Sequence, residues 1–412
     1  MATLLLRNAT LVDGTGAEPR PHSHVLVDGD RIASIRSGSG DCRAEHVIDL
    51  EGRCLLPGLI DAHTHLGAAV PIEAFTSGMT SAAELAAGIF RNCRNAIDAG
   101  FTTVRDVGGL DGGVARIVAT GVVPGPRILP AGPALVQHGG HGCLIPPYAK
   151  HGHGVLDLPG LSQDSILCDG PDQVRYAARE AFRRGARFIK VIATGGVVSY
   201  TDSLEDTQFT VEELRAAVVE AQARNTYVTA HAHNRRGIAN AIEGGVRCIE
   251  HGVYMDEATA STMKSADISF VPTISILHLF REDAARMGLP AEVLPRIKGV
   301  EKAQCDAVHI ARAAGLRMGS GSDLLGPDQR RFGLEIALKA EILGILEAIR
   351  SATSTNAEIL GLAREIGTIE VGKCADLLIM DSAVLDEPKM FDDTQNRDLV
   401  IQGGRVTVDR LR

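Results

Sequence analysis

The sequence lacks several features that would assign it to common classes of protein. None of its apolar stretches approaches the roughly 18 residues needed to span a bilayer as a helix. Its amino terminus has neither a basic segment nor an apolar core of the signal-peptide kind. Its eight cysteines form no Cys-x-x-Cys pair, so neither a disulfide framework nor a thiolate zinc site is indicated. We therefore expect a soluble protein of the reducing cytoplasm, without a membrane partner.

Basic residues are also too few for a typical nucleic-acid-binding protein. The 412 residues include 42 lysines and arginines against 51 aspartates and glutamates, a net charge of −9. This sign is wrong for a general binder of phosphate backbones. Apolar residues make up 45% and charged residues 23% of the chain, as in ordinary globular proteins. At about 150 residues per domain, the length allows two or three domains, or one barrel with an appendage.

Both ends of the chain show short strand patterns separated by turn residues. Residues 24–27 and 31–35 flank the turn Asp28-Gly29-Asp30. Residues 375–380 and 399–408 show the same pattern of short apolar runs beside turn residues. Neither end alone is large enough for a good core. We therefore expect residues 1–56 and 363–412 to pair into one small β-sandwich.

Between the ends, apolar runs of about four to eight residues alternate with helical patterns, which is typical of βα units around a parallel sheet. Eight candidate strands can be counted, the number of a closed (β/α)8 TIM barrel, so residues 57–362 are predicted to form an α/β barrel. Helices are expected over 171–184, 210–225 and 301–314. The second has a capping box at Thr210 and Glu213 and a plausible stop at Asn225. The strands are expected at residues 56–66, 102–107, 127–131, 188–194, 227–231, 248–250, 268–273 and 317–323.

Residues 137–170 depart from this alternation. They contain four histidines, seven glycines and three prolines with little periodicity. A loop of this length in a compact domain usually carries function or moves. Within it, His151 and His153 are either lid residues or merely solvated.

Side chains of the types that commonly bind metals lie at the carboxyl ends of the predicted strands. His63 and His65 are two residues apart, so they point to one face of their strand. His231, His251 and Asp323 each end a later strand. Because this end of a barrel hosts the active site, and histidine and carboxylate are common ligands of divalent metals, the sequence predicts a metal site there.

Lys190 interrupts the apolar run 188–193 on the fourth predicted strand. Burial in such a run disfavours the charged amine and lowers its pKa. The residue therefore has either a functional role or a structural ion pair with a neighbouring strand. The residues alone leave both interpretations open.

The order His-x-His, Lys, His, His, Asp on successive strand ends, led by Pro57-Gly58-Leu59-Ile60-Asp61, resembles the amidohydrolase superfamily. The segment Gly372-Lys373-Cys374-Ala375-Asp376-Leu377 resembles its returning sandwich strand, so the resemblance covers nearly the whole chain. Within the superfamily the sequence looks most like the binuclear branch of prolidases and ochratoxinases. One departure is Ser320-Gly321-Ser322-Asp323, where many relatives have Gly-Thr-Asp, and serine keeps the hydroxyl.

The resemblance implies two divalent metal ions, for which zinc is the first expectation although manganese and cobalt suit the same ligands. It also implies that carbon dioxide carboxylates Lys190, and that a hydroxide shared by the two ions attacks an amide carbonyl. Asp323 would then pass the proton to the leaving nitrogen. The implied ligands are His63, His65 and Asp323 for the more buried ion, His231 and His251 for the more exposed ion, and carboxylated Lys190 between them.

Substrate contacts are expected from side chains just beyond the strand ends. His138 and His141 follow the third strand and could hold a substrate carboxylate or stabilise an oxyanion. The alternative is a glycine-rich loop with incidental histidines. His233 shares a face with His231 but could equally be solvated, and Tyr200 is a candidate by location only.

We therefore expect a cytoplasmic metal-dependent hydrolase that cleaves the amide bond of small dipeptides or N-acyl amino acids. Because barrels of this family often associate, we also expect a homo-oligomer. The first alternative is a cyclic amide, imidazolone or carbamate hydrolase, or a deaminase with one metal, although mononuclear sites lack a bridging lysine. A catalytically inactive scaffold is a remote alternative, since such chains lose ligands and this one keeps six.

Overall fold

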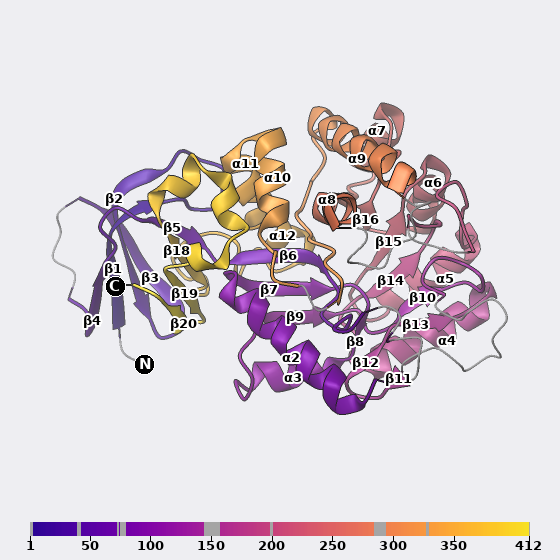
Figure 1. The fold of residues 1–412 in the computed structure, drawn as a ribbon, viewed down its shortest axis with the longest axis horizontal. Helices are drawn as coiled ribbons and strands as arrows, with labels where there is room; N and C mark the ends of the chain where they lie inside the picture. Colours follow the sequence, from indigo (N-terminus) through magenta and orange to yellow (C-terminus); the bar gives the residue numbers. More distant parts are fainter. Residues whose placement is uncertain are drawn as a thin grey trace.

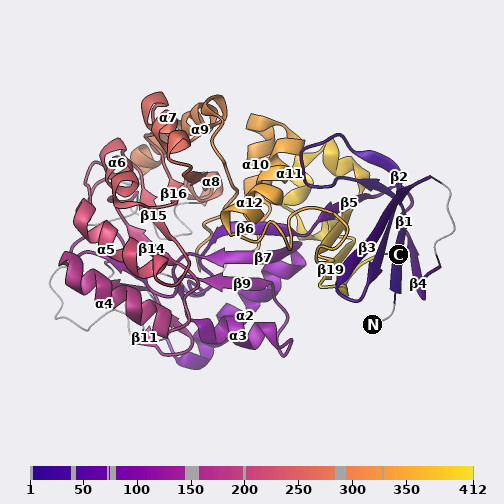
Figure 2. The ribbon, with the colours of Figure 1, turned by 180° about the vertical axis from the view of Figure 1, so that it is seen from behind.

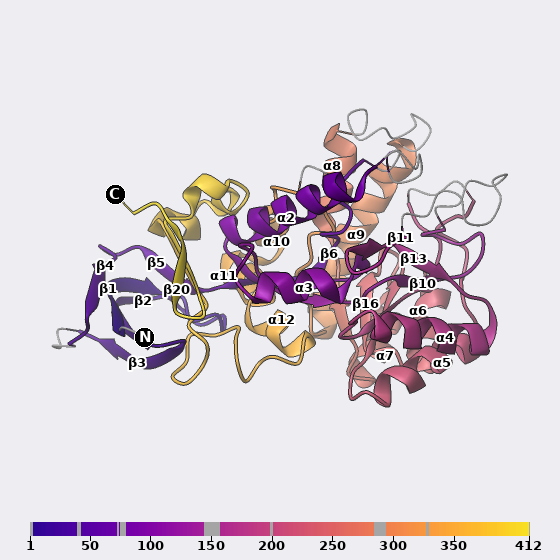
Figure 3. The same cartoon turned by 90° about the horizontal axis from the view of Figure 1, so that it is seen from below.

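The computed structural model describes residues 3–38, 43–71, 74, 80–143, 157–197, 201–283, 294–326 and 329–411. A sheet built from both chain termini lies at one end of the molecule, and a larger barrel occupies the rest (Figure 1). Helices α10 (Leu334–Leu343), α11 (Ile345–Ser351) and α12 (Ser354–Ile359) lie near the junction of the two bodies (Figure 3).

The terminal sheet has eight strands in the order β20-β19-β18-β5-β1-β2-β3, with β4 also paired to β1. The amino-terminal and carboxyl-terminal strands lie side by side because β18 pairs antiparallel with β5. Figure 2 shows this sheet from behind. This confirms the expectation that the two termini build one unit. The strands are β1 (Thr3–Leu11), β2 (Arg20–Asp28), β3 (Arg31–Ser37), β4 (His46–Asp49), β5 (Cys54–Pro57), β18 (Leu377–Met380), β19 (Leu399–Gln402) and β20 (Arg405–Asp409).

Strand β18 shows how this sheet is attached to the barrel. All four of its residues are buried. Leu377 and Ile379 belong to the core inside the terminal sheet, whereas Leu378 and Met380 pack in a cluster with α2 (Ala82–Asp98) of the barrel. Because side chains alternate along a strand, a continuous apolar run buries both faces of the sheet and fixes the two bodies together.

The barrel strands form two parallel sheets, β6-β7-β9 and β13-β10-β14-β15-β16-β17. Backbone hydrogen bonds close both seams between them. Arg187 N donates to the carbonyl of Pro130 at 2.7 Å between β9 and β14, and residues 317–323 bridge β17 and β6. The strands are β6 (Leu59–Thr64), β7 (Phe101–Asp106), β9 (Arg127–Pro130), β10 (Ala134–Val136), β13 (Ser165–Leu167), β14 (Ile189–Ile192), β15 (Val228–Ala232), β16 (Cys248–His251) and β17 (Ser269–Val271).

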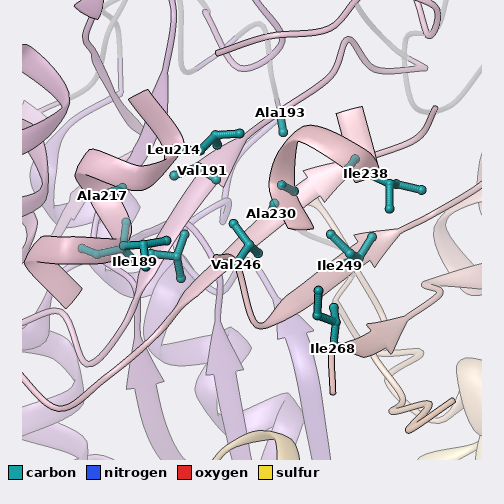
Figure 4. Close-up of a cluster of buried hydrophobic side chains, with 14 of the residues drawn as sticks. Ile189, Val191, Ala193, Leu214, Ala217, Ala230, Ile238, Val246, Ile249 and Ile268 are labelled. Carbon is teal, nitrogen blue, oxygen red and sulfur yellow. The ribbon is translucent and has the colours of Figure 1, made fainter. Parts of the chain in front are cut away.

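Helices cover the outside of the barrel. Figure 4 shows Ile189 and Val191 of β14 in one apolar cluster with Leu214 and Ala217 of α5. Among the described residues, no helix is both long and apolar enough to cross a membrane. The remaining helices are α3 (Gly112–Ala119), α4 (Gly170–Arg183), α5 (Val211–Gln222), α6 (Arg235–Gly244), α7 (Glu257–Ser265), α8 (Ile274–Asp283) and α9 (Leu294–Ala314).

The eight-stranded α/β barrel is confirmed if β9 and β10 count as one strand and residues 317–323 as the eighth, with β13 as an additional strand beside β10. Three details differ from the expectation. The run 56–66 divides between β5 in the terminal sheet and β6 in the barrel. The third strand breaks into β9 and β10 around Gly132, whose φ is +69°. Residues 317–323 form no regular ladder and have one isolated bridge, from Met318 to Phe270.

The predicted helices and the long loop can be compared in the same way. The structure contains α4, α5 and α9 in the expected places, and the capping box of Thr210 and Glu213 is present. Helix α5 ends at Gln222, and Asn225 has the expected left-handed conformation at φ +56°. Part of the expected loop 137–170 is strand: β11 (Asp157–Leu158), β12 (Ser162–Gln163), which pairs with β8 (Gly109–Leu110), and β13. His151 and His153 lie outside the described residues.

Candidate metal centre

His63 on β6, His65 just after β6, and Asp323 at the end of residues 317–323 lie close together. The Nε2 atoms of His63 and His65 lie 3.3 Å and 3.2 Å from the same carboxylate oxygen of Asp323. The backbone N–H of Asp323 donates to the carbonyl of His63 at 2.8 Å, which fixes the separation of the two segments. Three ligand side chains from one seam of the barrel therefore converge on one point.

Asp323 and His251 both have left-handed backbones, with φ of +53° and +70°. Residues other than glycine seldom adopt this conformation, and it is found preferentially at functional sites. In both residues it occurs where the chain leaves the carboxyl end of a barrel strand. At both positions the backbone therefore departs from the extended conformation of a strand.

Strands β15 and β16 supply the other two predicted histidine ligands. The rings of His231 and His251 are 4.5 Å apart, centroid to centroid, and His251 is 4.9 Å from His63. Nδ1 of His251 lies 3.8 Å from the second carboxylate oxygen of Asp323 and 2.7 Å from the hydroxyl of Thr273. The carboxylate of Asp323 thus lies between His65 and His63 on one side and His251 on the other.

The surroundings of this cluster favour neutral histidines and an ionised aspartate. Burial, together with the neighbouring histidines and Lys190, holds the pKa values of His231 and His251 well below their ordinary value. Burial alone would raise the pKa of Asp323, but the rings of His63 and His65 outweigh it and hold that pKa well below the ordinary range. Neutral imidazoles and an ionised carboxylate are the forms that bind metals.

Lys190 lies on β14, next to β15, and pairs in register with Thr229. Its side chain is buried among Glu250 and Asp323, whose negative charges oppose the effect of burial. Burial nevertheless lowers the pKa of Lys190 to about 8. The amine therefore releases its proton more readily than an exposed lysine does.

A buried network behind His63 contains residues that the sequence analysis did not single out. The carboxylate of Glu250 accepts from Nδ1 of His63 at 2.7 Å and pairs with Arg105 at 2.6 Å, and Thr229 donates its hydroxyl to the same carboxylate. Burial alone would raise the pKa of Glu250, yet Arg105 and His63 hold it well below the ordinary value. Arg105 and Glu250 interrupt buried strands just as Lys190 does, so the same signal could have identified them.

The donor set fits a divalent cation. Ligand atoms of His63, His251 and Asp323 all lie within 4.8 Å of one another. Glu250 fixes the proton of His63 on Nδ1, and Nε2 is buried without a hydrogen-bond partner among the described residues. A buried nitrogen lone pair directed at a carboxylate is costly unless a proton or a metal ion lies between them. A carboxylate behind a histidine is also the usual support of a metal ligand.

The predicted substrate residues have different surroundings. The ring of His141 stacks on His231 at 4.6 Å, and that of His233 stacks on His251 at 5.0 Å. Burial lowers the pKa of both rings, that of His233 to about 3. His138 pairs instead with Asp169 at 2.5 Å, next to the start of α4. Tyr200 lies outside the described residues.

Comparison with known proteins places this geometry in a family. The model of the amidohydrolase family matches residues 54–407. Ochratoxinase from Aspergillus niger is 31% identical over 409 residues, which cover 96% of this chain and 85% of that protein. A solved prolidase complexed with N-methylphosphonate-L-proline has a TM-score of 0.91 at 35% identity, covering 99% of this chain and 100% of that one.

A second solved structure, a Xaa-Pro dipeptidase with bound methionine in its active site, has a TM-score of 0.88 at 29% identity. The match covers 98% of this chain and 99% of that chain. The family model and the two kinds of relative agree over almost the full length. The chain is therefore a hydrolase that belongs to the amidohydrolase family.

Proposed function

We propose that this hydrolase holds two divalent metal ions and cleaves the amide bond of dipeptides or N-acyl amino acids. The observation that carries the proposal is the convergence of buried histidines on Asp323 at the carboxyl ends of the barrel strands. Its support from the comparisons is the full-length similarity to proteins named ochratoxinase, prolidase and Xaa-Pro dipeptidase. The released product would be the carboxyl-terminal amino acid.

The residues divide into two ligand groups in this proposal. His63, His65 and Asp323 would hold one ion, and His231 and His251 the other. Histidine and carboxylate donors suit zinc, and such ions would lower the pKa of a bound water and polarise the substrate carbonyl. Glu250 keeps Nε2 of His63 available by accepting the proton on Nδ1.

Lys190 would connect the two groups as a carbamate. A lysine with a pKa of about 8 is roughly one tenth neutral at pH 7, and the neutral amine is the form that attacks carbon dioxide. The new N–C bond forms as the nitrogen loses a proton to solvent. The product carries two oxygens and one negative charge, which a lysine amine cannot offer to a metal.

Asp323 would move the proton that amide cleavage requires. Its carboxylate lies 3.2 to 3.3 Å from Nε2 of His63 and of His65, where it would accept a proton from the attacking water. Delivery of that proton to the nitrogen makes the amine a competent leaving group. His141, stacked on His231, would stabilise the oxyanion or contact the substrate, and His233 would line the same pocket.

The test is a hydrolysis screen of the zinc-loaded protein with bicarbonate present. Mass spectrometry would follow Xaa-Pro dipeptides, other dipeptides and N-acyl amino acids, including ochratoxin A. We expect the wild type to release a free amino acid, and the Lys190→Ala and Asp323→Asn variants to release none. If a protein that carries two metals hydrolyses none of these compounds, the peptide-like substrate is wrong. Cyclic amides and carbamates would then be the next substrates to test.

A further inference from the structure

A cavity separate from the metal centre lies beside β9, between the start of α3 and the segment that leads into β14. Its volume is about 530 Å³, within the usual range for small-ligand sites. Its walls come from the start of α3, from β9, from the turn at Pro159 and Gly160, and from residues 183–187 before β14. None of the metal-centre residues lines it, and Arg187 enters β14 three residues before Lys190.

The cavity is strongly basic in a protein whose net charge is −9. Among the described residues, a single acidic side chain, Asp111, lines it. Arg184 holds that carboxylate through two nitrogens, at 2.8 Å and 2.7 Å. The cavity is lined by five arginines: Arg116, Arg127, Arg183, Arg184 and Arg187.

Ion pairs within the protein neutralise three of the five guanidinium groups. Arg127 pairs with Asp376 at 2.9 Å, Arg184 with Asp111, and Arg183 with Glu180. Arg116 and Arg187 form no ion pair with any described residue. Two positive charges on the cavity wall therefore lack an internal counter-charge.

The backbone segments around the cavity are fixed by close contacts between glycines. A Cβ on Gly113 would lie 2.1 Å from the carbonyl oxygen of Gly160, and one on Gly112 would lie 2.8 Å from Cα of Gly185. The backbone of Arg187 is fixed by its hydrogen bond to Pro130. The segments that carry the two unpaired arginines are therefore held in place before any ligand binds, which lowers the entropic cost of binding.

We propose that this cavity binds a small organic dianion, and specifically a phosphate monoester. Two guanidinium groups match two negative charges, and their planar donor pairs fit phosphate oxygens. Ile128, Pro130 and Leu362 add an apolar wall that suits the carbon part of such a ligand. A dicarboxylate has the same charge, so the experiment must separate the two.

The test is calorimetric titration of the metal-loaded protein with phenyl phosphate and with succinate. We expect phenyl phosphate to bind more tightly than succinate, and the double variant Arg116→Gln/Arg187→Gln to bind it at least about tenfold more weakly. Exposed Arg236 on α6 provides the control variant Arg236→Gln, which should bind as the wild type does. Binding at the metal centre would be equal in all three proteins, so it cannot produce this difference.

Two results would overturn the proposal. Equal affinity of the wild type and the double variant would show that these arginines do not form a site. Tighter binding of succinate would replace the phosphate monoester with a dicarboxylate. Both arginines are exposed, so the variant should fold, and its unchanged thermal unfolding midpoint would confirm that a loss of binding is local.

Discussion

Glu250 decides which nitrogen of His63 is available to a metal ion. Its carboxylate lies 2.7 Å from Nδ1 of His63 and 2.6 Å from a guanidinium nitrogen of Arg105. The carboxylate, His63 and Arg105 are all at least 99% buried. The network therefore sets both the tautomer of a ligand and the charge balance of the barrel interior.

Replacing Glu250 by glutamine tests this role. We expect Glu250→Gln to weaken metal binding about 10-fold to 100-fold, because the amide supports His63 less well. It should also destabilise the fold by roughly 3 kcal/mol, since Arg105 loses its buried counter-charge. Competition with a chromogenic chelator measures the first effect and thermal unfolding the second. The exposed Glu243 gives the control variant Glu243→Gln, and unchanged metal affinity in Glu250→Gln would refute the role.

A second residue-scale prediction concerns Lys190. Lys190→Met keeps an apolar side chain of similar length and removes the amine that would be carboxylated. We expect the metal content to fall from two ions per chain to one or fewer, as measured by plasma mass spectrometry of protein purified with zinc. Exposed Lys264 supplies the control Lys264→Met. Two retained ions and a normal hydrolysis rate would argue against a bridging lysine.

At the scale of single elements, α5 joins local and long-range contacts. The hydroxyl of Thr210 accepts from the backbone N–H of Glu213, and the carboxylate of Glu213 accepts from the backbone N–H of Thr210. Glu213 also accepts from the N–H of Gly170, the first residue of α4, at 2.6 Å. One side chain therefore caps α5 and attaches it to the neighbouring helix.

Two substitutions separate these contributions. Thr210→Ala should cost about 1 kcal/mol, because one cap hydrogen bond is lost. Glu213→Ala should cost more, because the N–H of Gly170 also loses its partner. Glu212→Ala, at an exposed position in the same turn, is the control. Thermal unfolding ranks the three variants, and a Glu213→Ala variant no less stable than Thr210→Ala would show that the link to α4 contributes nothing.

At the scale of the whole molecule, Asn356 supports one of the two seams that close the barrel. Its side-chain amide donates to the carbonyls of Ile60 and Ser320, at 2.6 Å and 2.8 Å, and accepts from the N–H of Ser320 at 3.0 Å. Residues 317–323 have no regular ladder of their own. This buried asparagine therefore reinforces the backbone hydrogen bonds that hold the segment presenting Asp323.

Asn356→Leu removes all three bonds while keeping a similar volume. We expect a loss of several kcal/mol in stability, because the carbonyl of Ile60 and the N–H of Ser320 each lose a partner, at about 1–3 kcal/mol for each buried group. Metal binding should also weaken, because Asp323 loses part of its support. Asn95→Leu removes a single bond, to Gln329, and should have a smaller effect on both. An Asn356→Leu variant as stable as the wild type would mean that the seam closes without this side chain.

Features that depend on residues close together in the sequence could be predicted from it. The apolar runs and their spacing predicted the barrel, and the capping box of Thr210 and Glu213 was readable because its residues are three apart. The break at Gly132 and the seam held by Asn356 depend on contacts between distant segments. The pairing of Arg105 with Glu250, 145 residues apart, was out of reach for the same reason, although each residue is an evident charge in a buried strand.

The central claim is that the histidine cluster, Asp323 and Lys190 form one binuclear metal centre. The most direct measurement is anomalous diffraction at the zinc edge from crystals of the zinc-loaded protein grown with bicarbonate. We predict two peaks, one beside His63, His65 and Asp323 and one beside His231 and His251, with additional density for a carboxyl group on Nζ of Lys190. A single peak, or two peaks beside an unmodified lysine, would contradict this account.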